Sequence, residues 1–322
     1  MIQTAKTGCS LRGGAVGPGR LYRVSLAIDG DARPHIAFVS EASDHLMYGF
    51  RNSSWQFEEV PTEAGLFAGS VRFPAMKLYR GDLEVEDVFK WRPHFCYQAG
   101  LALKHLAKQP RRDNPAAGAV WKKHFEEVDP VQVTEKGWYA TLDFDRAQDN
   151  TMRIAYFDEL PGAAKRQLRL ATMTQSFEPG VPNTWTVDVI DGGDVLGEFP
   201  ALARTISGGG AISYFERNAR QLKICMFGPF PESPAVEVVT GDVDNDDVWS
   251  SVGASFQFKF CIAYGSGGKL RYATRTGINT FDIQDVDSGG RWPSLAFDDN
   301  GTVHIAHVAG GTLKYATAAT GN

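Results

Sequence analysis

The sequence predicts an all-β fold, a six-bladed β-propeller whose blades have four strands each. A segment of similar sequence recurs six times, each copy contains short β-like runs separated by turn residues, and the copies follow one another at blade-like spacing. One shared position is occupied in turn by His35, His94, Arg153, Ala211, Cys261 and His304. These positions lie 43 to 59 residues apart. Periods of about 40 to 50 residues are typical of propeller blades, and longer loops account for the rest.

Each copy contains the same series of predicted strands. The first is an aromatic-Pro-small-Leu run such as "WPSLAF" at 292–297, and the second resembles "RIAYF" at 153–157. A Gly-rich or polar turn follows, then a third run such as "LKYAT" at 313–317. Five copies continue into a fourth segment, such as "WTVDVID" at 185–191. Four strands separated by turns are the content of one propeller blade.

We expect residues 1–322 to form a single propeller domain. The predicted blades run approximately over 20–61, 68–129, 137–191, 197–240, 247–287 and 290–322. The sixth copy lacks a fourth segment, and the stretch from Thr4 to Leu11 lies at the right distance before the first copy to supply it. The ring would thus be closed by an N-terminal strand that completes the C-terminal blade. Such pairing removes an exposed sheet edge.

Charge and composition argue against several classes of partner. The net charge is −5 and no basic block is present. The charge therefore does not favour binding to nucleic acid or to an anionic membrane. No apolar run approaches the roughly 20 residues of a membrane span, and the N-terminus lacks the apolar core of a signal peptide. We therefore expect a cytoplasmic protein, whose oligomeric state the sequence does not determine. Cys9, Cys96, Cys225 and Cys261 lack metal-binding spacing, which favours free thiols.

His304 and His307 do not form a chelating pair. Residues three apart in a strand point to opposite faces, whereas metal ligands must converge on one ion. His304 fills a repeated slot that also holds His35 and His94, which indicates a structural role. His307 instead replaces an aromatic residue found in the other five copies, namely Phe38, Tyr97, Tyr156, Tyr214 and Tyr264. This exception makes His307 a candidate for proton transfer.

The starts of the first strands contain a second set of candidates. The opening position is aromatic in five copies, as Phe73, Tyr139, Phe199, Trp249 and Trp292, but it is Arg23 in the first copy. One residue earlier stand Tyr22, Arg72, Trp138, Glu198, Val248 and Arg291. These strand starts should surround the channel mouth, where propeller ligands bind.

Copies six, one and two are neighbours in the predicted ring. Arg291, Arg23 and Arg72 should therefore lie on one side of the mouth, together with Tyr22 and His307. Guanidinium groups recognise carboxylate, sulfate or phosphate, so we expect an anionic ligand there. Trp138, Trp249 and Trp292 are further candidates for contact with that ligand.

Acidic residues suggest two other sites. Asp158 and Glu216 follow the second strands of adjacent copies and would face the arginines as an acid and base pair. Asp242, Asp244 and Asp246 lie in one loop, and clustered carboxylates are oxygen ligands suited to Ca²⁺. Solvated surface charges are the alternative explanation for both groups.

The repeats, with their Pro-Ser-Leu, His-Ile-Ala-Tyr and Leu-Lys-Tyr-Ala elements, resemble the sialidase-like and related bacterial β-propellers. The resemblance covers nearly the whole chain at the level of the fold. It implies a carbohydrate-active propeller with its ligand at the channel mouth. Similar propeller lyases use Tyr, His and Arg around the channel, which Tyr22, His307 and Arg23 would supply here.

Three functions stay open on the sequence. The first is a protein that binds an anionic sugar or another small anion at the mouth, as a glycoside hydrolase or polysaccharide lyase if it is an enzyme. The second is a non-catalytic lectin or protein-interaction propeller with sites repeated between blades. The third is a small-molecule hydrolase or biosynthetic lyase with a site at the propeller axis.

Overall fold

A computed structural model describes most of the repeat-bearing sequence. The described residues are 3–5, 25–29, 33–40, 45–51, 53–61, 71–80, 91–100, 102–110, 119–121, 126–129, 135–144, 151–159, 166–174, 183–193, 196–205, 209–228, 234–241, 243–244, 249–255, 259–298, 301–310 and 312–318. Within these ranges every regular element is a β-strand, and no helix is long and apolar enough to cross a membrane.

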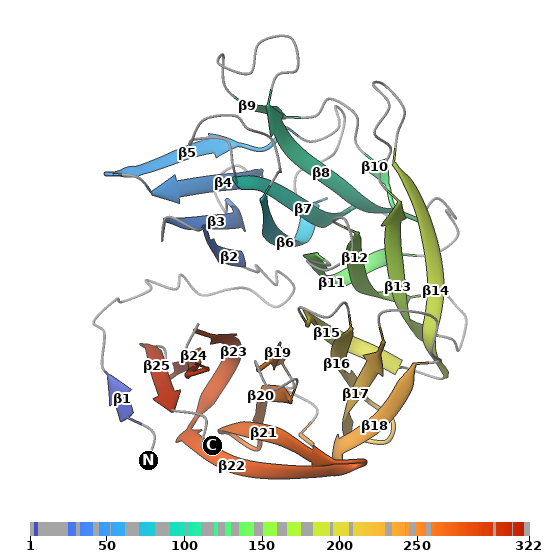
Figure 1. The fold of residues 1–322 in the computed structure, drawn as a ribbon, viewed down its shortest axis with the longest axis vertical. Coiled ribbons are helices and arrows are strands. Elements are labelled where there is room, and N and C mark those ends of the chain that lie inside the picture. The colour runs from blue at the N-terminus through green and yellow to red at the C-terminus, as the bar shows by residue number, and fades with distance from the viewer. Residues whose placement is uncertain are drawn as a thin grey trace.

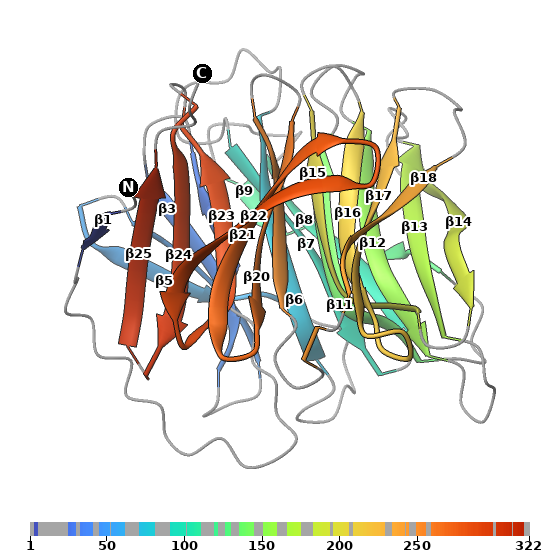
Figure 2. The same ribbon diagram turned by 90° about the horizontal axis from the view of Figure 1, so that it is seen from below.

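The predicted six-bladed propeller is confirmed. Six antiparallel sheets follow one another around a ring (Figure 1), and their strands run between its two faces (Figure 2). Blade 1 contains β2 (Ser25–Ile28), β3 (Pro34–Val39), β4 (Leu46–Arg51) and β5 (Trp55–Glu59). Blade 2 contains β6 (Val71–Arg80), β7 (Trp91–Ala99), β8 (Ala102–Pro110), β9 (Ala119–Trp121) and β10 (Glu126–Glu127). Blade 3 contains β11 (Glu135–Phe144), β12 (Met152–Glu159), β13 (Arg166–Thr174) and β14 (Thr184–Gly193).

The remaining three blades complete the ring in chain order. Blade 4 contains β15 (Leu196–Arg204), β16 (Gly210–Glu216), β17 (Gln221–Phe227) and β18 (Ala235–Thr240). Blade 5 contains β19 (Ser250–Ala254), β20 (Phe260–Ser266), β21 (Lys269–Gly277) and β22 (Thr280–Ser288). Blade 6 contains β23 (Gly290–Phe297), β24 (Val303–Ala309), β25 (Thr312–Ala318) and β1 (Gln3–Ala5).

The N-terminal strand completes blade 6, as the sequence predicts. β1 pairs antiparallel with β25, and Thr4 lies opposite Ala316. The strand is shorter than the predicted segment, whose residues 6–11 lie outside the described part of the chain. Blade 2 also departs from the four-strand pattern, because its predicted fourth strand is divided into β9 and β10, which pair with different parts of β8.

Apolar contacts between neighbouring blades form the core. Among the described residues there are five apolar clusters, and each joins one blade to the next from blade 1 to blade 6. A small second-strand residue of one blade meets the larger residues of the following blade. These small residues are fully buried and comprise Ala37, Cys96, Ala155, Ser213 and Ala263. Strands packed on both faces need this alternation of small and large side chains, because protein interiors are close-packed.

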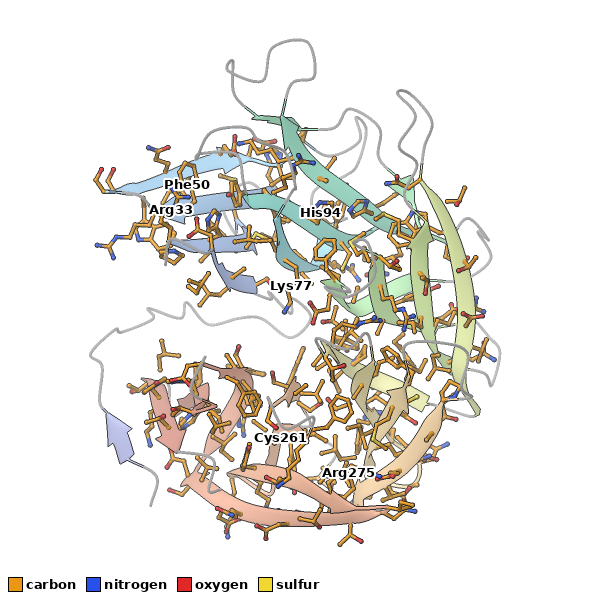
Figure 3. All side chains as sticks on the ribbon, viewed as in Figure 1. Arg33, Phe50, Lys77, His94, Cys261 and Arg275 are labelled. Carbon is orange, nitrogen blue, oxygen red and sulfur yellow. The ribbon has the colours of Figure 1, made fainter. Side chains whose placement is uncertain are left out.

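Charged contacts cross the blade joints as well. Arg275 on β21, labelled in Figure 3, bonds to Glu237 on β18 of the preceding blade. Nη2 donates to Oε1 at 2.6 Å and Nε donates to Oε2 at 2.8 Å. Glu237 is buried, and the guanidinium hydrogen bond holds the pKa of its carboxyl below the ordinary value despite the opposing effect of burial. This bidentate ion pair fixes the distance between β21 and β18.

Removal of residues 1–5 should destabilise the ring. Without β1, the outer edge of β25 loses its backbone partner, and the N-terminal segment no longer ties into blade 6. We expect the unfolding temperature to fall by roughly 5 °C or more. The control is Gln3→Ala, which keeps the backbone pairing. Unfolding temperatures would be measured by circular dichroism. A truncated protein that unfolds at the same temperature as the full-length chain would show that β1 does not stabilise the fold.

Candidate functional site

Three of the first strands begin with a backbone distortion. We call the side of the ring on which the first strands begin and the second strands end the mouth. Tyr139, Phe199 and Trp292 have left-handed backbone angles, with φ of 55°, 53° and 51°. The pairing register shifts at the same points of β11, β15 and β23. Left-handed φ strains a bulky residue, and bulges of this kind turn side chains out of the ladder.

Three aromatic residues at the starts of the first strands, Tyr139, Phe199 and Trp249, meet on one side of the mouth. The centroids of Tyr139 and Phe199 are 4.3 Å apart, and those of Phe199 and Trp249 are 4.6 Å apart. Tyr139 and Trp249 complete the group, with a centroid distance of 5.6 Å and an edge-to-face angle of 89°. Because these residues come from blades 3, 4 and 5, the cluster occupies that side of the mouth. Trp292 of blade 6 is 51% exposed.

Two of the predicted arginines lie in the described structure. Arg72 is the second residue of β6 and Arg291 the second residue of β23, and both are exposed. Arg291 directly precedes Trp292, so blade 6 presents a guanidinium and an indole at consecutive positions. The backbone of Trp138 pairs with Phe157. Tyr22 and Arg23 lie outside the described residues.

Two of the second-strand tyrosines, Tyr214 and Tyr156, bond to the preceding blade. The Tyr214 hydroxyl donates to Oδ2 of Asp191, the carboxylate near the end of β14, at 2.6 Å. Lys223, opposite Tyr214 on β17, places Nζ 3.7 Å from the same oxygen and 2.6 Å from Oε2 of Glu216. We call this arrangement of second-strand donor, third-strand cation and preceding-blade carboxylate an interblade lock.

The joint between blades 2 and 3 contains the same lock. The buried Tyr156 hydroxyl donates to Oδ2 of Asp129 at 2.7 Å, and Nη1 of Arg169 lies 3.3 Å from that oxygen. Nε of Arg169 lies 2.7 Å from Oδ2 of Asp158, which is 1% exposed. Burial and the neighbouring Asp129 raise the pKa of Tyr156 far above its ordinary value, so its hydroxyl stays protonated as a donor.

His307 takes the tyrosine's place in the lock between blades 5 and 6. It is 1% exposed, and its Nε2 lies 2.8 Å from Oδ2 of Asp287. Nζ of Lys314 donates to the same oxygen at 2.8 Å. Burial raises the pKa of the Asp287 carboxyl, but the hydrogen bonds from His307 and Lys314 outweigh it and hold that pKa below its ordinary value. Nδ1 of His307 has no hydrogen-bond partner among the described residues.

These contacts define the surroundings of the predicted acid and base residues. Asp158 and Glu216 are each ion-paired with a cation on the third strand of their own blade. His307 bonds to a carboxylate across a joint. Asp158 and Glu216 therefore join strands within their own blades, whereas His307 joins two blades. The catalytic roles of all three stay predictions.

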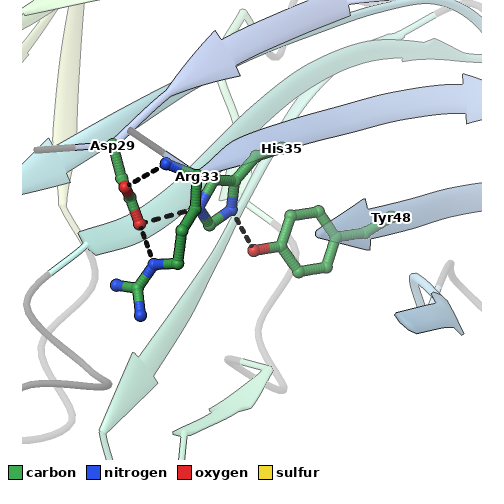
Figure 4. Close-up of polar contacts among 4 residues, drawn as sticks. All are labelled: Asp29, Arg33, His35 and Tyr48. Carbon is green, nitrogen blue, oxygen red and sulfur yellow. Dashed lines mark hydrogen bonds and ion pairs between the residues drawn. The ribbon is translucent and has the colours of Figure 1, made fainter. Parts of the chain in front are cut away.

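The repeated histidines form separate networks on the opposite face. Nε2 of His35 lies 3.2 Å from Asp29, and Nδ1 lies 2.6 Å from the hydroxyl of Tyr48 (Figure 4). Asp29 also accepts hydrogen bonds from the backbone N and side-chain Nε of Arg33, at 2.8 and 2.7 Å. The Asp29 carboxylate thus holds the His35 imidazole in the tautomer that carries its hydrogen on Nε2. Nδ1 then accepts a hydrogen bond from the Tyr48 hydroxyl.

Two other blades vary this network. In blade 6, Nδ1 of His304 bonds to the Tyr315 hydroxyl, and Nε2 lies 3.3 Å from Asp298. In blade 2, Nδ1 of His94 lies 3.1 Å from Nε2 of His105, which takes the place of the tyrosine. His304 and His307 therefore have separate partners, which agrees with their predicted positions on opposite faces of the strand.

The predicted calcium loop lies largely outside the described residues, which include Asp244 but neither Asp242 nor Asp246. Asp244 is exposed, and its backbone N donates to Oγ of Ser266 at 3.4 Å. Among the described residues no three His, Cys, Asp or Glu side chains are grouped to hold a metal ion. Calcium binding by this loop stays a prediction.

No protein-family model matches the chain, and neither does any curated protein. Several solved structures share its fold. A fungal lectin from Aleuria aurantia, a six-bladed propeller with a novel mode of fucose recognition, has a TM-score of 0.59 at 11% identity, and the match covers 92% of this chain and 91% of the lectin. The intramolecular trans-sialidase of Ruminococcus gnavus has a TM-score of 0.53 at 9% identity, covering 92% and 94%.

A leech intramolecular trans-sialidase has a TM-score of 0.52 at 9% identity, and the match covers 93% of this chain and 68% of the leech protein. The expected resemblance to sialidase-like propellers is thereby confirmed at the level of the fold. Identities this low carry no activity across, because one fold supports many functions.

Sequence reasoning missed the carboxylates of the locks. Asp129, Asp191 and Asp287 each follow a Val or Ile at the end of a fourth-strand segment, in "EEVDP", "DVIDG" and "QDVDS". That recurrent Asp was a usable signal. Its partners belong to the next copy, so alignment of equivalent positions alone does not reveal the contact.

Substitution of Asp287 by Asn should destabilise the blade 5 to blade 6 joint in a pH-dependent way. The folded-state pKa lies below the ordinary 3.8, so the carboxylate stabilises the fold fully above that value and loses this effect as pH falls through the folded pKa. We expect a loss of about 2 kcal/mol near pH 7, from hydrogen bonds to a charged acceptor. The loss should shrink below about pH 4.

Urea unfolding at several pH values measures this effect. The matched control is Asp285→Asn on the same strand, where an exposed carboxylate pairs with Lys269 and Arg271. An exposed pair contributes little, so this variant should behave nearly as wild type. Equal effects of the two substitutions would contradict the assigned role of Asp287.

Proposed function

We propose that this propeller binds an acidic sugar, or another small organic anion, at the channel mouth on the side of blades 6, 1 and 2. The asymmetry of the mouth carries this proposal. Tyr139, Phe199 and Trp249 pack against one another on the side of blades 3 to 5. On the opposite side Trp292 is half exposed and directly follows the exposed Arg291.

The two side chains suit complementary parts of such a ligand. An indole offers a flat apolar surface for the C–H face of a sugar ring. A guanidinium recognises a carboxylate through two parallel hydrogen bonds. The proposed site also includes Arg72 and Trp138, together with Tyr22 and Arg23, whose places at the mouth are predictions from the repeat pattern.

Binding without catalysis is the form of this function that the contacts favour. Asp158, Glu216 and His307 would be the acid and base groups of a hydrolase or lyase, with Tyr22 as a further proton carrier. Each of the three described groups is committed to an ion pair or a hydrogen bond that joins strands or blades. A lectin-like role needs no free acid and base pair, and the similarity in fold to a lectin agrees with it.

Titration calorimetry with N-acetylneuraminate and glucuronate tests the proposal, with fucose and N-acetylglucosamine as neutral probes. We expect one binding event per chain with the acidic sugars. Arg291→Ala should weaken that binding about tenfold or more, because a charge-assisted hydrogen bond is lost. Trp292→Ala should weaken the binding of acidic and neutral sugars to the same degree.

The controls are Trp55→Ala and Arg51→Ala on the outer strands of blade 1, where both residues are also exposed. They should leave affinity unchanged. Several equivalent binding events per chain, unaffected by Arg291→Ala, would instead indicate lectin sites repeated between blades. Turnover of a glycoside that is lost in His307→Phe but retained in Trp55→Ala would favour the catalytic alternative.

A further inference from the structure

Tyr48 lies at the contact between blades 1 and 2. It belongs to β4 and is 4% exposed. Its ring meets that of Phe95 on β7 edge to face, with a centroid distance of 5.9 Å and an angle of 89°. Nζ of Lys108 on β8 lies 5.6 Å from the centroid of the Tyr48 ring and also bonds to Glu58 on β5. The position of the Tyr48 ring therefore affects how the two blades meet.

His35 holds the Tyr48 hydroxyl from within blade 1 (Figure 4). Nδ1 lies 2.6 Å from the hydroxyl oxygen, and Nε2 lies 3.2 Å from Oδ2 of Asp29. A neutral imidazole offers one donor and one acceptor, whereas an ionised carboxylate only accepts. The hydrogen therefore lies on Nε2, and Nδ1 accepts from the hydroxyl. Both ring nitrogens are in use with a single hydrogen on the ring.

A second proton on His35 conflicts with this arrangement. It would bind to Nδ1, at which the hydroxyl hydrogen of Tyr48 already points, so the hydroxyl would have to change from donor to acceptor. The charge is unfavourable as well. The His35 side chain is 7% exposed, and Arg33 already donates to Asp29 from its backbone N and from Nε, at 2.8 and 2.7 Å. An imidazolium would be a second cation on one buried carboxylate.

Charged groups from several elements lie around this network. Asp29 and Arg33 stand on either side of the turn between β2 and β3. Glu58 belongs to β5 of the same blade, and Lys108 belongs to β8 of blade 2. Burial and the nearby carboxylates of Glu58 and Asp29 raise the pKa of Tyr48 well above its ordinary value. The Tyr48 hydroxyl therefore keeps its hydrogen, and His35 is the group that titrates.

The surroundings of His35 set the direction of this titration. Burial lowers the pKa of His35 below its ordinary value of 6.5, and the charge of Arg33 adds to this effect. Together they outweigh the hydrogen bond and the charge of Asp29, which raise that pKa. The unfolded chain thus takes up the proton at a higher pH than the folded protein. The stability that neutral His35 contributes is fully present above about pH 6.5 and is lost as the pH falls toward the folded-state pKa.

We propose that the joint between blades 1 and 2 is acid-sensitive: a proton taken up at Nδ1 of His35 breaks the hydrogen bond with Tyr48, whose ring then moves away from Phe95 and Lys108. Acidification thereby loosens one particular joint of the ring. The proton alone is the effector, so this behaviour does not depend on the ligand proposed for the mouth.

Substitution of His35 by Gln tests the titration. The Gln amide offers a donor and an acceptor, as neutral His35 does, but it takes up no proton in this range. Urea unfolding at about pH 7.5 and about pH 5.5 compares the two proteins. Between these values the unfolding equilibrium constant of the unaltered protein should rise about fivefold more than that of His35→Gln. The same pH dependence in both proteins would overturn the proposal.

The matched control is His45→Gln. His45 lies in the same blade, but its side chain is 50% exposed and pairs at 2.9 Å with Glu59, which is similarly exposed. An exposed pair contributes little to stability. This variant should therefore keep the pH dependence of the unaltered protein. A reduced dependence in His45→Gln equal to that in His35→Gln would contradict the role assigned to His35.

NMR of the unaltered protein tests the movement of the ring and needs no variant. The nitrogen shifts of the His35 imidazole report its protonation, and the nuclear Overhauser effect between the rings of Tyr48 and Phe95 reports their contact. We expect this effect to be lost as His35 becomes protonated, while that between Tyr139 and Phe199, at the joint of blades 3 and 4, persists. A contact that survives protonation of His35, or an imidazole that stays neutral at about pH 5.5, would overturn the proposal.

Discussion

The contact between neighbouring blades is the constraint on which the rest of this structure depends. Among the described residues, blades 1 to 5 each bury a face of small residues against the larger residues of the next blade. No blade could stand alone, since a four-stranded sheet with two apolar faces needs a neighbour on each side. Directed hydrogen bonds supplement this packing. These hydrogen bonds are directional and therefore restrict the angle between neighbouring blades, whereas apolar contacts are not directional.

The interblade locks connect this constraint to the proposed function. Tyr156, Tyr214 and His307 lie toward the mouth ends of their strands, and each bonds to a carboxylate of the preceding blade. The positions of the first-strand aromatics around the mouth therefore depend on bonds that lie outside the proposed ligand site. A histidine at one lock keeps the same contact as a tyrosine, so its departure from the repeat pattern has a structural explanation that is independent of catalysis.

Repeat comparison predicts the ring, its six blades, the strand series and the N-terminal closure, because these follow from periods within one chain. It also predicts which positions open the first strands. It does not predict that Tyr139 and Phe199 take left-handed backbone angles and pack against Trp249, since that depends on the geometry between blades. Nor does it show that His307 faces Asp287, 20 residues earlier. Aligned copies show which residues are equivalent, whereas the site is formed by residues of successive copies.

A double-mutant cycle on Tyr214 and Asp191 tests most directly whether the locks hold the blades together. Tyr214→Phe, Asp191→Asn and the double variant would be compared by their free energies of unfolding in urea. A bond buried between two blades predicts a coupling energy of about 1 to 3 kcal/mol between the two sites. Additive effects, with a coupling energy near zero, would mean that the hydroxyl and the carboxylate do not act together and that apolar packing alone joins the blades.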